Sequence, residues 1–167
     1  MGATPDILVG MLMGSESDWE TMSKAHKLLK EFGITHECRV LSAHRTPTEV
    51  VEFIQSLESR GAQVFIAGAG LAAALPGVVA AHTTKPVLGV PMAAGPLQGQ
   101  DALYSIVQMP PGIPVGTLGI GASGATNAAL LAVAILALGR PELAQALTEY
   151  REKRAKQVLD TVLPMGD

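Results

Sequence analysis

Short apolar runs recur along the chain, and most are followed by a stretch with helical spacing. The first run, Ile7–Met13, is apolar on both faces, which is typical of a central strand in a parallel sheet. Four later runs also fit strands, at Glu37–Leu41, Gln63–Ala69, Pro86–Val90 and Val115–Ile120. The pattern therefore predicts a sheet of five strands.

Helices are expected after each of these strands. The first has large side chains at helical spacing and ends near Gly33; they are Trp19, Met22, His26 and Leu29. The others are expected at Pro47–Arg60, Ala72–Ala81, Gly99–Gln108 and Ala125–Leu138. Five βα units in series predict a three-layer α/β fold with a parallel sheet, right-handed crossovers and the strand order 2-1-3-4-5. We expect a single domain over residues 1–167 with its core at about 7–138.

A C-terminal helix, expected over about 141–163 and opened by Pro141, differs from the helix before it. The helix over Ala125–Leu138 is almost wholly apolar and is expected to be buried, whereas the C-terminal helix carries many charges. Its apolar stripe is narrow and consists of Leu143, Leu147, Tyr150 and Val158. Two interpretations stay open: the helix lies on its own domain, or it packs as an arm on a neighbouring subunit.

Composition narrows the class of protein. Apolar residues make up 48% of the 167 residues and charged residues only 16%, which excludes a disordered chain. The net charge of −3, without a dense basic run, gives no reason to expect a nucleic-acid partner. No apolar stretch reaches the roughly 20 residues that span a bilayer and no signal-peptide pattern occurs, so we expect a cytoplasmic protein with no membrane partner. So few surface charges suggest a homo-oligomer. The single cysteine, Cys38, excludes both a disulfide framework and a thiolate metal site.

A polar loop follows the first predicted strand, at the edge of the sheet where doubly wound proteins bind ligands. Gly14 and Ser15 place backbone N–H groups and a hydroxyl beside a helix N-terminus, which favours a phosphate. Ser17 and Glu20 have capping-box spacing, so Ser17 is expected to be the N-cap. Asp18 either interacts with the helix dipole or accepts hydrogen bonds from sugar hydroxyls.

A second polar loop follows the second predicted strand. Thr46 and Glu49 again have capping-box spacing, and Pro47 fits the first helical position. His44 and Arg45 are not needed to start this helix. They are therefore candidates for an acid–base group and an anion-binding group, the alternative for His44 being a solvated loop histidine.

The other histidines are weaker candidates. His26 belongs to the core-facing side of the first helix, His36 begins a strand, and His82 ends a helix. No two histidines are spaced as metal ligands, so no metal is predicted.

Two further segments are rich in small residues. The segment over 67–77 is either tightly packed between helix and sheet or forms a dry, narrow pocket walled by backbone. The segment Gly119–Gly124 matches the dinucleotide fingerprint G-x-G-x-x-G, but no further βα unit and no acidic residue about 20 positions on follow it. We expect a close turn there, with no dinucleotide or other organic cofactor.

Several motifs occur in a fixed order along the chain. They are MGSESDW (13–19), SAHRTP (42–47), AGAG (67–70) with LPG (75–77), PVLGVP (86–91) and LYSIVQMPPGIPVGTLGIG (103–121). Together they resemble the PurE family, the 5-(carboxyamino)imidazole ribonucleotide mutases of de novo purine synthesis, in its bacterial class I. The resemblance implies a flavodoxin-like three-layer fold and a homo-octamer, with active sites at subunit boundaries and the C-terminal helix reaching a neighbour.

The resemblance also implies a reaction. The carboxylate on the exocyclic nitrogen of the ribonucleotide moves to ring carbon C4, without ATP, metal or organic cofactor. By the matching motifs, Ser15, Asp18 and Arg45 bind the nucleotide and His44 transfers protons. The remaining substrate-binding residues are expected to be Gly14, Ser42, Ala69, Gly70 and Leu75. Our mechanistic hypothesis is that the carbamate loses carbon dioxide, which stays in the apolar pocket until C4 attacks it.

The chain departs from the family pattern in the third segment. Where the family has GGAAHLPG, Leu71 replaces the second glycine and Ala74 replaces the histidine, and the loop over 92–96 has lost polar residues. One alternative is an aminoimidazole ribonucleotide carboxylase that uses free carbon dioxide, although the Ser-Asn variant that marks that class is absent from this segment. A non-enzyme alternative is a flavodoxin-like nucleotide-binding or receiver module, but the first strand lacks the acidic cluster that a receiver needs.

Overall fold

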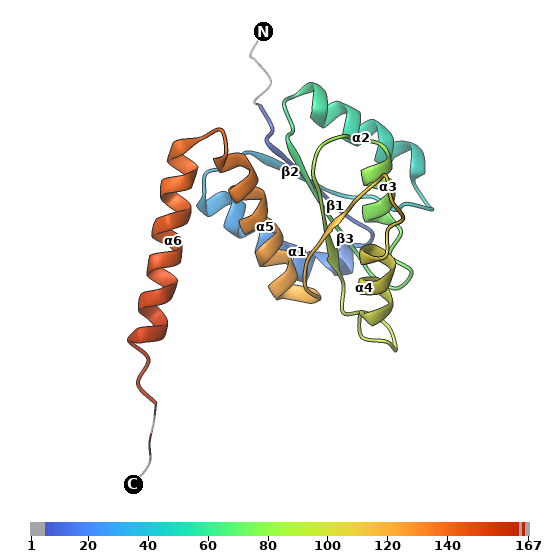
Figure 1. Cartoon of the computed structure of the whole chain (residues 1–167). Coiled ribbons are helices and arrows are strands. Elements are labelled where there is room, and N and C mark those ends of the chain that lie inside the picture. The colour runs from blue at the N-terminus through green and yellow to red at the C-terminus, as the bar shows by residue number, and fades with distance from the viewer. Residues whose placement is uncertain (1–5, 164, 166–167) are drawn as a thin grey trace.

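In the computed structural model, which describes residues 6–163 and Met165, five parallel strands form one sheet (Figure 1). The strand order β2-β1-β3-β4-β5 confirms the predicted order. The strands are β1 (Val9–Met13), β2 (His36–Val40), β3 (Val64–Ala69), β4 (Val87–Pro91) and β5 (Gly116–Thr117). Their carboxyl ends all lie at one edge of the sheet, because every pairing between neighbours is parallel.

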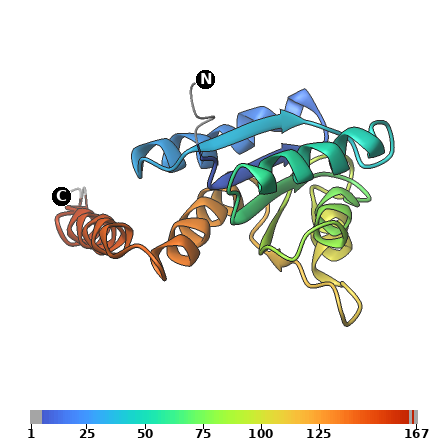
Figure 2. The same ribbon diagram turned by 90° about the horizontal axis from the view of Figure 1, so that it is seen from above.

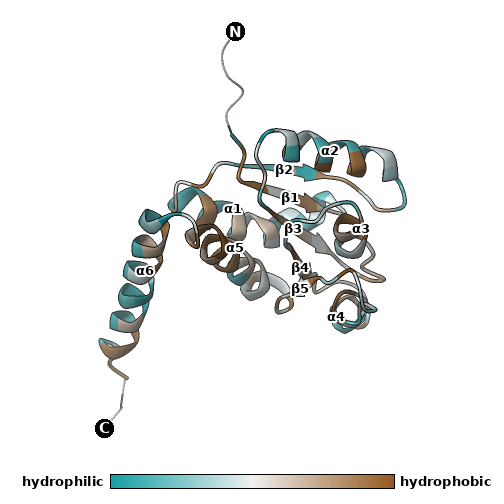
Figure 3. Cartoon of the chain, turned by 45° about the horizontal axis from the view of Figure 1, so that its top comes forward, coloured by the Kyte–Doolittle hydropathy of each residue, from teal (hydrophilic) through white to brown (hydrophobic). Residues whose placement is uncertain are grey.

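Helices cover both faces of the sheet, which gives the three layers of the predicted flavodoxin-like fold (Figure 3). They are η1 (Glu16–Asp18), α1 (Trp19–Glu31), α2 (Pro47–Ser59), α3 (Leu75–Ala81), α4 (Gln100–Val107), α5 (Gly121–Ala137) and α6 (Pro141–Leu159). Helices α1 and α5 pack on one face, and α2, α3 and α4 pack on the other. Side chains of β3 alternate between the two cores: Val64 and Ile66 join the α1/α5 core, whereas Phe65 and Ala67 join the α2/α3 core. Burial on both faces explains why this strand is continuously apolar.

The glycine-rich segment before α5 is a close turn, as expected from its sequence. A Cβ atom at Gly124 would lie 1.6 Å from the carbonyl oxygen of Gly119, and Gly121 has a φ of +72°. Only glycine fits at position 124, and glycine adopts the left-handed backbone at position 121 with the least strain. The turn makes α5 begin at Gly121, before the predicted start at Ala125, and β5 is shorter than the predicted run.

The first half of α6 packs on its own domain, and its second half extends away from the sheet (Figures 1 and 2). Leu143 and Leu147 are buried, and the Tyr150 ring lies 5.6 Å from the Phe32 ring between centroids. Beyond them, Val158 and Leu159 are 74% and 83% exposed. Within the described residues, no helix has both the length and the apolar composition that crossing a bilayer requires.

Candidate functional site

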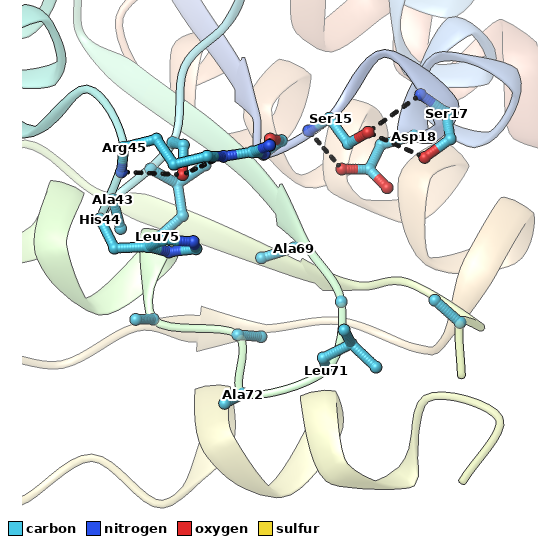
Figure 4. A pocket seen from close by; sticks show the side chains of 16 residues that line it. Ser15, Ser17, Asp18, Ala43, His44, Arg45, Ala69, Leu71, Ala72 and Leu75 are labelled. Atoms are coloured by element: carbon cyan, nitrogen blue, oxygen red, sulfur yellow. Dashed lines mark hydrogen bonds between the residues drawn. The ribbon is translucent and has the colours of Figure 1, made fainter. Parts of the chain in front are cut away.

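A cavity of about 310 Å³ lies where the loops after β1, β2 and β3 meet at the carboxyl edge of the sheet (Figure 4). All the residues that the sequence nominated line it: Gly14, Ser15, Asp18, Ser42, His44, Arg45, Ala69, Gly70 and Leu75. They come from segments far apart in the chain. The parallel sheet brings them together because strands β2, β1 and β3 are adjacent.

The loop after β1 is organised by Ser15 and Asp18. The Ser15 hydroxyl accepts a hydrogen bond from the Ser17 N–H, and the Asp18 Oδ2 accepts one from the Ser15 N–H at 3.0 Å. Ser15 is thus the N-cap of η1, Asp18 takes the N-cap position of α1, and the predicted capping box between Ser17 and Glu20 is wrong. A short η1 turn precedes α1, so the cap lies two residues earlier than the spacing suggested. Both capping residues therefore already have partners within the loop.

The Asp18 carboxyl group is half-buried at the cavity. Burial raises its pKa above the ordinary value of 3.8, and hydrogen bonds from the backbone of Ser15 and Gly14 oppose that rise. Further hydrogen-bond donors near this carboxyl group would therefore stabilise its ionised form. Sugar hydroxyl groups of a bound nucleotide are donors of this kind.

The loop after β2 is held by Thr46 and Ser42. The Thr46 Oγ1 accepts a hydrogen bond from the Ser42 N–H at 2.8 Å and donates one to the Ser42 carbonyl oxygen at 3.2 Å. Thr46 is the N-cap position and Pro47 the first residue of α2, as predicted, but the predicted capping box with Glu49 is wrong. The hydroxyl of Thr46 faces back into the loop, so it stabilises the turn that carries His44 and Arg45.

The Arg45 guanidinium joins the two polar loops. Its Nη2 donates a hydrogen bond to the Gly14 carbonyl oxygen at 2.9 Å, and its Nε donates one to the Ser42 Oγ at 3.3 Å. Arg45 is nevertheless exposed, and a guanidinium carries five N–H donors. Donors therefore remain for an anion in the cavity.

The His44 ring points into the space between Arg45 and the small-residue wall (Figure 4). His44 is exposed, and within the described part of the chain its ring makes no hydrogen bond. An imidazole ring can both donate and accept a proton. Its position and its freedom suit proton transfer to a ligand.

The third wall of the cavity is the segment from Ala69 to Leu75, in which every side chain is apolar. Leu71 has a φ of +56° and is 53% exposed. A leucine in this left-handed conformation is strained, and the bend it makes keeps 71–74 as loop, so that α3 begins at Leu75 and not at the predicted Ala72. This wall carries no charged or hydrogen-bonding side chain.

Sequence spacing missed one cluster outside the cavity. His26 on α1 and His36 on β2 lie 2.8 Å apart between the Nδ1 and Nε2 atoms, and Cys38 is beside them. The prediction of no metal rested on sequence spacing alone, whereas tertiary packing brings together histidines that are ten positions apart in the chain. One cysteine likewise suffices for a mixed site with two imidazoles, so it does not exclude thiolate ligation.

The chain matches one known protein family over most of its length. The model of the family described as AIR carboxylase matches residues 8–157. The chain belongs to the AIR carboxylase family. The match covers all five strands and most of α6, and it includes every residue of the cavity described above.

Several relatives at about half identity share one name. The N5-carboxyaminoimidazole ribonucleotide mutases of Vibrio cholerae and Escherichia coli K12 are each 52% identical to this chain, over 93% and 95% of it and 97% and 94% of their own lengths. That of Aquifex aeolicus is 57% identical over 84% of this chain and 83% of its own. The crystal structure of Treponema denticola PurE superposes with a TM-score of 0.83 at 34% identity, covering 92% of this chain and 94% of that one. The resemblance drawn from the motifs is thus confirmed, and so is the fold.

Proposed function

We propose that this chain is the mutase of de novo purine synthesis that moves a carboxylate from the exocyclic nitrogen of 5-carboxyamino-1-(5-phosphoribosyl)imidazole to ring carbon C4. The product is 5-amino-1-(5-phosphoribosyl)imidazole-4-carboxylate. The observation that carries the proposal is the meeting of the GSESDW and SAHRTP loops in one cavity. The names of the relatives, which are half identical over nearly the whole chain, support it.

The cavity offers a group for each part of the ribonucleotide. Arg45 and the Ser15 hydroxyl lie beside the start of a helix, where a phosphate is favoured. The Asp18 carboxylate can accept hydrogen bonds from the ribose hydroxyls. The walls that hold the base are completed by Gly14 and Ser42 and by the apolar segment that contains Ala69, Gly70 and Leu75.

We assign both proton transfers to His44. In the first step the N–CO₂⁻ bond of the carbamate breaks, the nitrogen receives a proton from the imidazolium, and carbon dioxide is released into the cavity. In the second step the C4 enamine carbon attacks that carbon dioxide, and the neutral imidazole removes the C4 proton. The charge and the proton of His44 are restored, so neither a metal nor an organic cofactor is needed.

Retention of carbon dioxide is the task of the apolar wall. Recapture competes with escape into water, so a pocket without charged or hydrogen-bonding side chains favours the second step. The wall over 69–75, which includes Leu71, has this composition. No ionisable side chain replaces the family's histidine at Ala74, which leaves His44 as the proton-transfer group at the base.

We also propose that the protein is a cytoplasmic homo-oligomer, an octamer as the family resemblance implies. Charged phosphoribosyl intermediates do not cross membranes, so the enzyme must work where they are made. The outer half of α6 and the adjoining C-terminal residues bear exposed apolar side chains, at Val158, Leu159, Val162 and Leu163, which a second copy would bury. Light scattering at a fixed protein concentration measures the mass. A monomer at micromolar concentration contradicts this proposal.

Offering two substrates to the purified protein tests the function. One sample contains the N-carboxylated ribonucleotide, and the other contains 5-amino-1-(5-phosphoribosyl)imidazole with bicarbonate and carbonic anhydrase. The mutase produces the 4-carboxylate from the first at low dissolved carbon dioxide. A carboxylase, the second candidate and the activity that gives the family its description, requires the second mixture and a rate that rises with dissolved carbon dioxide. A non-catalytic binding module changes the ultraviolet absorbance only by an amount proportional to the protein concentration, without turnover.

A further inference from the structure

A cluster of two histidines and one cysteine lies between α1 and the edge strand β2, on the face of the sheet opposite α2. His26 comes from α1, and His36 and Cys38 come from alternate positions of β2, which places both on the same face of the strand. The two histidine nitrogens and the cysteine sulfur all lie within 4.8 Å of one another. We propose that His26, His36 and Cys38 together bind a zinc ion.

Side-chain rotations can bring the three ligand atoms, which lie within 4.8 Å of one another, to the spacing that zinc requires. With Zn–N bonds of about 2.0 Å and a Zn–S bond of about 2.3 Å, tetrahedral ligands lie about 3.3 Å (N to N) and about 3.5 Å (N to S) apart. The nitrogens of His26 and His36 are 2.8 Å apart and share a hydrogen bond, so the rings need to separate by about half an ångström. All three residues are only partly buried, so the side chains can move and an ion can enter.

The tautomer of His36 is already set for a metal. Its Nδ1 lies 2.7 Å from the Ile34 carbonyl oxygen, to which it donates a hydrogen bond. The proton therefore resides on Nδ1, and the lone pair of Nε2 faces His26 and Cys38. A metal-binding histidine almost always donates its second ring N–H to such an outer partner, which fixes the ring and raises its basicity.

The protonation states suit a cation that displaces a proton. Burial, followed by the positive charge of neighbouring groups, lowers the pKa of His26 and so favours the neutral imidazole that binds a metal. Burial, with Glu37 nearby, raises the pKa of the Cys38 thiol to about 11, so the free protein carries the thiol. Binding therefore forms a Zn–S bond, breaks the S–H bond and releases one proton to the buffer, and affinity rises with pH.

The donor set selects among metals. Two imidazoles and one thiolate suit zinc, whereas calcium and magnesium prefer oxygen ligands. The thioether of Met11 lies 3.7 Å from the Cys38 sulfur on the core side. It is fully buried, so the solvent side of the cluster supplies the fourth ligand as a water molecule.

A direct reporter is built into the site. Trp19 is the only tryptophan in the chain, and its ring centroid lies 5.4 Å from that of His26. A metal on the His26 ring changes the environment of this indole. Tryptophan fluorescence therefore follows occupancy, independently of catalysis.

The experiment uses the full-length protein, freed of metal with a chelator, kept reduced, and titrated with zinc chloride. We expect saturable 1:1 binding in fluorescence and calorimetry, with proton release, and an intense near-ultraviolet thiolate-to-metal band when cobalt(II) replaces zinc. Cys38→Ser removes that band, and C38S and His36→Gln each weaken zinc binding by more than about 100-fold. Circular dichroism verifies that both variants are folded.

Two control variants separate this site from other histidines. His82→Ala removes an exposed histidine at the end of α3, and His44→Asn removes the one in the cavity, so both are expected to leave zinc affinity within about threefold of wild type. The proposal is overturned if wild-type protein shows no saturable 1:1 binding at micromolar zinc. It is equally overturned if the cobalt band persists in C38S, or if H82A or H44N weakens binding as much as C38S does.

Discussion

The Leu71 side chain occupies the space that a side chain at Gly95 would need, and a double-mutant cycle measures the resulting coupling between the two positions. Gly95 has a φ of +69°, and a Cβ atom added there would lie 2.5 Å from the Leu71 Cδ2. In Gly95→Ala the left-handed backbone costs about 1 kcal/mol, partly offset by the reduced entropy of the unfolded chain. Leu71 must also leave its rotamer, which costs about 1 kcal/mol more.

Leu71→Gly removes the side chain that the new methyl group meets. As a single substitution, Leu71→Gly relieves the left-handed strain at position 71, which stabilises the protein by about 1–2 kcal/mol. The flexibility of glycine and the lost contacts of a half-exposed side chain oppose this gain, so the unfolding free energy changes by less than about 1 kcal/mol. In the L71G background, Gly95→Ala is then expected to cost about 1 kcal/mol less than in the wild type. That coupling corresponds to a melting-temperature difference of about 2–4 °C for a chain of this length.

Urea unfolding of the four proteins at one protein concentration measures the coupling, because oligomerisation makes apparent stability depend on concentration. The slope of unfolding free energy against urea must agree among the variants for the comparison to hold. If Gly95→Ala costs the same with and without Leu71, the two positions do not contact each other as described. In that case the double variant is less stable than the wild type by the sum of the two single costs.

Three further predictions concern the polar loops. His44→Asn lowers kcat about 10²–10⁴-fold in the absorbance assay. It changes the urea midpoint little, because His44 is exposed. Near-wild-type turnover in this variant contradicts the role of His44 in proton transfer. Arg45→Ala raises KM more than tenfold. Arg45→Lys restores little of the lost affinity, because an ammonium cannot reproduce the two guanidinium hydrogen bonds to Gly14 and Ser42. A wild-type KM in the lysine variant argues against the role of Arg45 in joining the two loops. The raised pKa of Asp18 means that its protonated form stabilises the fold below pH 3.8 and that this contribution is lost as pH rises through the higher folded-state pKa. The unfolding free energy of wild type minus that of Asp18→Asn therefore falls across this window, and a rise with pH contradicts the assignment.

Local periodicity predicted the strands and the loops that carry the site, whereas the strand order was taken from the usual arrangement of doubly wound sheets of this size. A strand buried on both faces needs a continuous apolar run, so β1 and β3 could be predicted from their residues. A parallel sheet places the loops after its strands at one edge, so the two polar loops could be predicted as well. The names Ser15, Asp18, His44 and Arg45 came from motifs within those loops, and all four line one cavity.

Tertiary structure decided which groups touch. Capping-box spacing nominated Ser17, but the backbone turn that precedes α1 presents the Ser15 hydroxyl instead, and spacing carries no information on that dihedral choice. The left-handed Leu71 is invisible in sequence because leucine is disfavoured there. His26 and His36 meet only because α1 packs against the edge of β2, a contact between elements that no local pattern encodes. The chain thus determines its elements through short-range spacing, while the pairing of side chains from different elements depends on how those elements pack.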